Sequence, residues 1–170
     1  EGEQRALEQV QQCHEEKARL QTQCAGQVGL RGLFAQGLMG QDGVPSTDIR
    51  ESISARPGNT LIPSEAHSYR ADTGRTEGGH KVVRLAVVQE LHNNGKTPWT
   101  PAGAVLVGPR GEEWKALGVW PLKPIAPGKF RQVVVEVETT EEQARGAFTL
   151  KLWSQEGGGH VELFEGVTFP

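Results

Sequence analysis

The sequence has few of the residues on which disulfide-rich and metal-binding folds depend. Two cysteines, one methionine and one tyrosine occur in 170 residues, and aromatic residues make up 6%. Two cysteines are too few for a small secreted domain that relies on disulfides for stability. No apolar run approaches the roughly 20 residues that cross a bilayer, and the formal net charge is only −3. We therefore expect neither membrane insertion of this chain nor a nucleic-acid partner.

Motifs of known catalytic chemistry are also missing. The sequence has no Gly-x-Ser-x-Gly elbow and no glycine-rich loop that ends in Lys-Ser/Thr, and its paired carboxylates are consecutive rather than facing. The histidines occur singly, and the adjacent Cys13 and His14 would point about 100° apart on a helix, which does not suit a zinc site. We expect a protein that is not an enzyme and that binds no metal or cofactor.

The composition changes at about residue 47, and 170 residues allow one domain plus an appendage. Residues 1–25 are dense in Glu, Gln, Arg and Ala, contain no proline, and predict a long helix that ends at Gly26. A short amphipathic helix is expected next, and we interpret its apolar stripe as buried core rather than a cofactor site. That stripe consists of Leu30, Leu33, Phe34, Leu38 and Met39. The predicted parts are a helical segment, 1–47, and a β-sandwich domain, 48–170.

The long predicted helix carries the three-and-four spacing of a coiled-coil seam. Its a positions are Val10, Lys17 and Cys24, and its d positions are Ala6, Cys13 and Leu20. Three heptads with weak core residues leave two interpretations open: a coiled coil, or a single amphipathic helix that lies against the domain. In a parallel coil each cysteine would meet its own copy, so an inter-chain disulfide is one hypothesis and two small buried thiols the other.

From residue 48 onward the hydrophobic period changes to two, which predicts strands separated by turns. Residues 71–79 are expected to form a mobile loop, and Gly157–Gly159 a hairpin turn. The segment 81–91 is apolar on both faces, which predicts a central strand covered on both sides. The number and spacing of the strands predict an immunoglobulin-like antiparallel β-sandwich. The expected strands are 49–55, 60–69, 81–91, 104–107, 114–120, 130–138, 148–153 and 160–169.

The tryptophans are the candidate binding residues of the sandwich: Trp99, Trp114, Trp120 and Trp153. Trp114 and Trp120 are six residues apart and share a face if their strand is regular, and Trp153 falls on the outward phase of its strand. Exposed tryptophans stack on sugar rings or form protein-binding patches. The alternative is that the N-terminal helices cover this face.

Several blocks of the sequence carry a resemblance to a known family. They are Gly29–Leu33, Asp48–Arg50, Arg56–Asn59, Pro98–Thr100, Ile125–Gly128, Ala147–Trp153 and Gly166–Pro170. Together they resemble the myxobacterial paralogous family of unknown function catalogued as DUF 2381, over nearly the whole chain. Its members usually carry a signal peptide and a further β-rich N-terminal region. The resemblance therefore implies the C-terminal portion of an exported protein, in the periplasm, the envelope or outside the cell, and it brings no catalytic residues.

These observations favour an exported, non-catalytic interaction protein. We expect the sandwich to bind a protein partner and the N-terminal helix to act as a spacer or to form a homodimer, although a fold does not dictate a function. The chain begins at Glu1 rather than at methionine, and we expect a processed protein or a fragment. The alternative function is a carbohydrate-binding module that holds a polysaccharide on its tryptophans, and a third is a hydrolase with a site assembled from distant loops.

Overall fold

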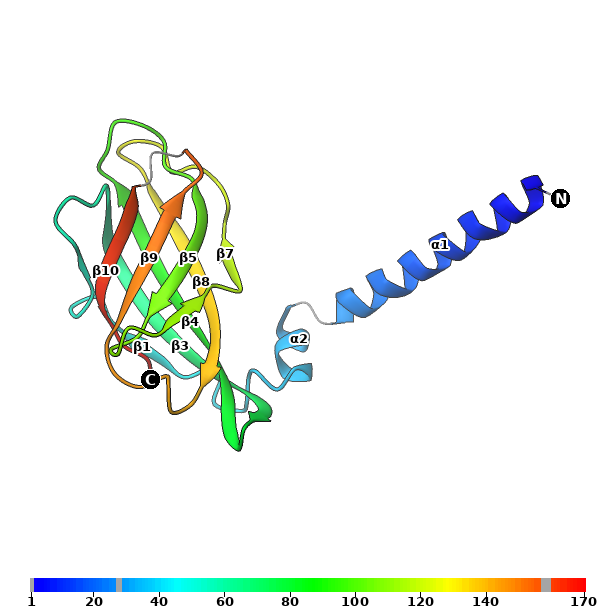
Figure 1. Cartoon of the computed structure of the whole chain (residues 1–170), viewed down its shortest axis with the longest axis horizontal. Helices are drawn as coiled ribbons and strands as arrows, with labels where there is room; N and C mark the ends of the chain where they lie inside the picture. The colour runs from blue at the N-terminus through cyan, green and yellow to red at the C-terminus, as the bar shows by residue number, and fades with distance from the viewer. Residues whose placement is uncertain (1, 27–28, 157–159) are drawn as a thin grey trace.

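Two helices precede a β-rich domain in the computed structural model, which describes residues 2–26, 29–156 and 160–170, with the side chains of residues 21–29 left aside. Helix α1 spans Gly2–Gly26 and helix α2 spans Gly29–Ala35. Figure 1 shows α1 extending away from the sheets and α2 lying beside them. The predicted end of the long helix at Gly26 is confirmed, whereas the predicted turn at Gly157–Gly159 lies outside the described residues.

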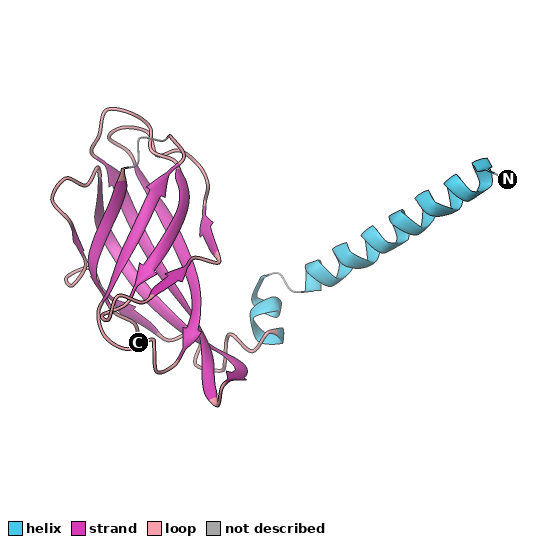
Figure 2. Ribbon diagram, in the orientation of Figure 1, coloured by secondary structure: helices cyan, strands magenta, loops and turns pink. Residues whose placement is uncertain are grey.

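The strands form two antiparallel sheets of five strands each (Figure 2). The order is β1–β3–β4–β8–β7 in the first sheet and β2–β10–β9–β5–β6 in the second. The prediction of a mainly β, antiparallel architecture is confirmed. The strands are β1 (Ser46–Asp48), β2 (Ser54–Ala55), β3 (Leu61–Glu77), β4 (His80–Asn93), β5 (Pro101–Val107), β6 (Glu113–Lys115), β7 (Gly118–Trp120), β8 (Phe130–Thr140), β9 (Phe148–Ser154) and β10 (Val161–Val167).

An apolar core fills the space between the two sheets. Every second side chain of β4, β8 and β9 points into it, because successive residues of a strand face opposite sides. These buried residues are Val83, Leu85, Val87, Val133, Val135, Val137, Phe148, Leu150 and Leu152. Each such side chain contributes roughly 1.5–3 kcal/mol when fully buried. Strand β4 pairs with β3 on one side and β8 on the other, so its predicted central position is confirmed.

Two of the predicted strands are wrong because the chain changes sheets within them. The expected strand 49–55 is interrupted by a turn in which the Ile53 amide donates to the Ile49 carbonyl at 2.8 Å, and both isoleucines are buried. The expected strand 114–120 is divided between β6 in the second sheet and β7 in the first. The Ala116 amide donates to Ala104 and the next amide to Glu136, so the chain crosses between sheets at this point.

The expected loop over 71–79 is also wrong. Strand β3 continues to Glu77 and pairs with the start of β4, so that the two strands form a long hairpin that projects beyond the sheets (Figure 1). At the irregularity in this pairing, the Thr73 hydroxyl donates to the Val82 carbonyl at 2.7 Å. Pairing with an apolar strand therefore overrides the polar, glycine-bearing composition of the segment.

Gln89 is a polar residue inside the apolar core. Its side chain lies on the inner face of β4 at 2% exposure, and its Oε1 has no hydrogen-bond partner within the described chain. We expect Gln89→Leu, which keeps a similar volume and removes the unpaired acceptor, to raise the free energy of unfolding by about 1 kcal/mol. Urea denaturation measures this change. A leucine variant less stable than the wild type would contradict the prediction, and Gln89→Glu is the control that should lose stability.

Candidate binding surface

The outer face of the first sheet carries a set of exposed apolar side chains. Cross-strand pairing aligns Ile62 of β3, His92 of β4 and Phe130 of β8 in one row. A second apolar row, further along the same strands, joins Val88, Val134 and Trp120. Phe130 is 56% exposed and Trp120 is 65% exposed. We call these residues the outer apolar face: Ile62, Val88, His92, Trp120, Phe130 and Val134.

The aromatic groups of this face are positioned by their neighbours. The rings of His92 and Phe130 have centroids 4.5 Å apart and are tilted by 36°, so each restricts the rotation of the other. Trp120 projects from the last residue of β7, an edge strand, beside Val134. Phe130 and Val134 are four residues apart on β8, which places the two rows about 13 Å apart along the strand. The face therefore presents two separate apolar contact points.

A polar row separates the two apolar rows. Glu65 of β3, Glu90 of β4 and Gln132 of β8 are cross-strand neighbours, and with His67 and Val88 they line a pocket of about 170 Å³. We call Glu65 and Glu90 the acidic pair. Among the described residues neither forms an ion pair. Like charges that face each other across strands are destabilising, so a cation placed between them would stabilise this row.

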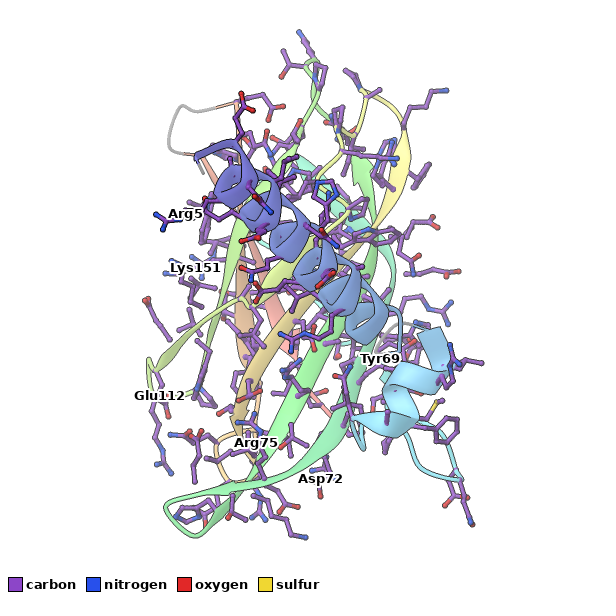
Figure 3. All side chains as sticks on the ribbon, turned by 90° about the vertical axis from the view of Figure 1, so that its right-hand side faces the viewer. Arg5, Tyr69, Asp72, Arg75, Glu112 and Lys151 are labelled. Atoms are coloured by element: carbon purple, nitrogen blue, oxygen red, sulfur yellow. The ribbon has the colours of Figure 1, made fainter. Side chains whose placement is uncertain are left out.

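Helix α2 lies beside the adjacent part of the same sheet. Leu33 and Leu38 line a pocket of about 150 Å³ together with Tyr69 of β3, and Figure 3 shows Tyr69 beside the helix. Leu33 and Leu38 are half-buried, but Leu30 and Phe34 are exposed. The expected burial of the whole apolar stripe is therefore wrong. Strand β4 is also predicted to be covered on both sides along its length, but on its outer side α2 lies beside one part of the strand and, within the described part of the chain, leaves the rest uncovered.

An ion-pair network connects β4 and β8 to the projecting hairpin. Arg84 donates to Glu138 at 2.7 Å and to Glu136 at 2.9 Å, and Arg75 of the hairpin donates to Glu138 at 2.6 Å. The hydrogen bond from Arg84, followed by the bond from Arg75, holds the pKa of the Glu138 carboxyl below its usual range. Glu138 is therefore bound between two guanidinium groups where the hairpin leaves the sheet.

This network predicts a pH dependence of stability. Because the pKa of Glu138 is lower in the folded than in the unfolded chain, its contribution is present above the unfolded pKa and is lost as the pH falls through the folded pKa. We expect Glu138→Gln to be less stable than wild type near neutral pH and to lose less further stability in acid. Urea denaturation between about pH 6 and about pH 3 tests this. Equal acid dependence in both proteins would contradict it.

The structure does not bring the four tryptophans together, so the expected shared tryptophan surface is wrong. Trp99 is 6% exposed and belongs to the core, where its backbone amide and carbonyl bond with Ile125. Trp114 is half-buried and packs edge-to-face against Phe148 at 5.8 Å. Since Trp114 lies on β6 of the second sheet, it cannot share a face with a residue of β7.

Trp120 and Trp153 lie on different sheets. Trp153, on β9, is half-buried and lies over Gly103, where an added Cβ would meet the indole ring at 2.4 Å. Trp120 remains as the exposed member of the set and belongs to the outer apolar face. Sequence spacing pointed to Trp120, but it missed Phe130, whose exposure follows from its position in the register of β8.

The apolar stripe of α1 has no cover in the structure. Every described side chain from residue 2 to residue 20 is exposed, with Val10 at 54% and Leu20 at 49%. Cys13 is a free, exposed thiol, and Lys17 forms no ion pair with any described residue. The side chain of Cys24 lies outside the described residues. The helix does not lie against its own sheets (Figure 1).

A larger hollow, of about 390 Å³, lies on the outer face of the second sheet. It is lined by aliphatic side chains, including Val107 and Leu163, and by the cations Arg56 and Lys151. Both cations already have carboxylate partners: Arg56 bonds with Glu165, and Lys151 lies 3.8 Å from Glu113. Charge on this face is therefore compensated, unlike the charge of the acidic pair.

Two kinds of feature are absent from the part of the chain that the structure describes. None of the helices in the described ranges combines the length and the apolar character that crossing a membrane requires. Within the same ranges, no three His, Cys, Asp or Glu side chains are grouped so that they could hold a metal ion.

The chain was also compared with known proteins. No curated protein matches it. A solved structure described as the X-ray structure of Northeast Structural Genomics Consortium target SoR45 is similar at 9% identity and a TM-score of 0.39, over 70% of this chain and 89% of that one. That similarity is too low to support an argument. A family model described as a protein of unknown function, DUF2381, matches residues 3–166. This match covers nearly the whole chain, which is therefore a member of the DUF2381 family.

Proposed function

We propose that this chain is a non-catalytic interaction protein that associates with a second copy through α1 and binds a protein partner through its sandwich. The observation that carries the proposal is the uncovered apolar stripe of α1. Most of the stability of a protein helix comes from packing of an amphipathic face, and the 25-residue α1 lacks that packing in the described single chain. Contact between its stripe, including Val10 and Leu20, and another chain would supply the missing burial.

The outer apolar face supports the second half of the proposal. Trp and Phe dominate the energetics of protein interfaces, and exposed apolar patches mark contact sites. Trp120 and Phe130 are both more than half exposed on this face. We also propose that the two sheets form an immunoglobulin-like sandwich and that the protein is exported from the cytoplasm. The antiparallel sheets around one core support the classification.

Molar mass in solution tests the self-association. We expect size exclusion with light scattering to give about twice 18.5 kDa for the wild type and 18.5 kDa for Val10→Glu/Leu20→Glu, because both side chains would then place charge in the contact. Both positions are exposed, so the sandwich should fold normally. The matched control, Gln4→Glu/Gln12→Glu, adds the same charge away from the stripe and should remain dimeric. A monomeric wild type would refute the self-association.

Carbohydrate binding is a second candidate function, favoured by the position of Trp120 beside a polar row. An exposed indole ring can stack on a sugar, while Glu90 and Gln132 offer hydrogen-bond acceptors to its hydroxyl groups. The test is tryptophan fluorescence during titration with neutral polysaccharides. A shift that is lost in Trp120→Ala and kept in Trp153→Phe supports this function. Flat titrations with every glycan count against it.

A further inference from the structure

Lys17 is poorly suited to the coiled coil that the spacing of α1 suggests. It occupies the centre of the stripe, between Cys13 and Leu20, in a position that faces its own copy in a parallel two-stranded coil. Two lysines would then meet in the seam, at a cost in stability. Of the remaining seam residues, Ala6, Val10 and Cys13 are small and offer little burial to offset that cost. A contact surface with negative charge at its centre would pair with Lys17, whereas a second α1 would place another lysine opposite it.

The outer apolar face has the complementary arrangement. We propose that α1 of one copy lies on the outer apolar face of a second copy and runs along its strands, with Lys17 between Glu65 and Glu90. This inference rests on the proposed self-association and identifies the two surfaces that meet. Neither carboxylate has a cationic partner, and Lys17 has no anionic one, within the described residues. Glu90 Oε1 already accepts a hydrogen bond from the Ser64 hydroxyl at 3.0 Å, but no described cation pairs with it. The association therefore gives ion-pair partners to three charged side chains that have none within the described residues.

The distances between charged and apolar side chains are similar along β4 and along α1. On β4, Val88 and His92 lie two residues to either side of Glu90, which is about 7 Å along the strand in each direction. On α1, Cys13 lies about 6 Å and Leu20 about 4.5 Å from Lys17 along the helix axis. A helix that runs along the strands thus brings Lys17 to the acidic pair and its apolar neighbours to the two apolar rows, where Trp120 and Phe130 are exposed.

The alternative surface on the same domain is electrostatically unsuitable. The hollow on the second sheet is bordered by Arg56 and Lys151, which would repel Lys17. On the first sheet, α2 already occupies the region around Tyr69 and leaves the acidic pair uncovered. Because each chain carries one α1 and one outer apolar face, two chains can exchange their α1 helices about a two-fold axis. Such an exchange closes the assembly at a dimer.

Charge reversal tests the proposed contact. We expect Lys17→Glu and Glu90→Lys each to weaken the dimer about tenfold or more, and the double variant to recover most of that loss, because opposite charges again face each other. The control is Glu77→Lys, an exposed glutamate at the hairpin tip, which should leave the dissociation constant unchanged. A coiled coil predicts that Glu90→Lys behaves like the wild type, and that result would overturn the inference.

Cysteine crosslinking gives an independent readout of the same contact. In a Cys24→Ser background, mild oxidation should link Cys13 to a cysteine introduced in the other chain by Val88→Cys or by His92→Cys, the positions that flank Glu90 on β4. It should not link Cys13 to Thr149→Cys on the second sheet. A dimer that links Cys13 to its own copy overturns the inference but leaves self-association standing. A monomer, with or without an internal crosslink from Cys13 to either introduced cysteine, overturns both.

Discussion

Gly166→Ala is expected to lower the free energy of unfolding by about 3 kcal/mol or more. Gly166 lies at an irregularity of β10 where the pairing with β9 shifts register, and its φ is +77°. A Cβ at this position would lie 2.0 Å from the carbonyl oxygen of Ser52. The obstacle is backbone, so no side-chain rotation relieves it. The segment before β2 would have to move away from β10, and urea denaturation would report the loss.

The control for this prediction separates steric overlap from backbone strain. Gly111 also has a positive φ, +86°, but nothing lies within 4 Å of the position that a Cβ would take there. Gly111→Ala should therefore cost only about 1 kcal/mol, the cost of holding a residue with a side chain in the left-handed region. Equal losses in the two variants would show that contact with Ser52 is unimportant, contrary to the prediction.

Glu162→Ala is the second substitution with a large expected effect, again about 3 kcal/mol. The carboxylate is fully buried, and it accepts the Thr60 amide at 2.9 and 3.0 Å and the Leu61 amide at 3.3 Å. His160 Nε2 lies 3.1 Å from the same group. Alanine would leave the buried Leu61 amide and the half-buried Thr60 amide without this acceptor at the point where the chain enters β3. The loss therefore exceeds that of an ordinary surface contact.

Glu165 supplies a matched control on the same strand. It is half exposed and pairs with Arg56 at the surface, so Glu165→Ala should cost less than about 1 kcal/mol. Chemical denaturation of the two variants at neutral pH gives the comparison. If Glu162→Ala were no more damaging than Glu165→Ala, the buried carboxylate would not hold the two segments together as the hydrogen bonds indicate.

Regular patterns made much of the fold predictable. The alternating valines of β8, at Val133, Val135 and Val137, mark a strand with one buried face, and all three are buried. The continuous apolar run of β4 marks the central strand. Helix α1 is predicted from composition and ends at Gly26 as expected. In each case a local pattern and the tertiary structure agree, which is the condition for predicting an element from sequence.

The candidate surface was less predictable because it depends on register. The pairing of β3 with β4 shifts between Pro63 and Glu65, which places Glu65 opposite Glu90 on the outer side of the sheet. A shift of one residue reverses the face of every following side chain. The burial of Trp99 depends on its pairing with Ile125, a residue distant in the sequence. Neither relation leaves a periodic signal in the chain.

Amide hydrogen exchange reports whether another chain covers α1. We expect the amides of residues 2–20 to be protected at high protein concentration, and this protection to fall on dilution as the dimer dissociates. An uncovered helix opens readily and exchanges fast. Rapid exchange of these amides at every concentration would show that α1 has no partner in a second copy, and the proposed self-association would be wrong.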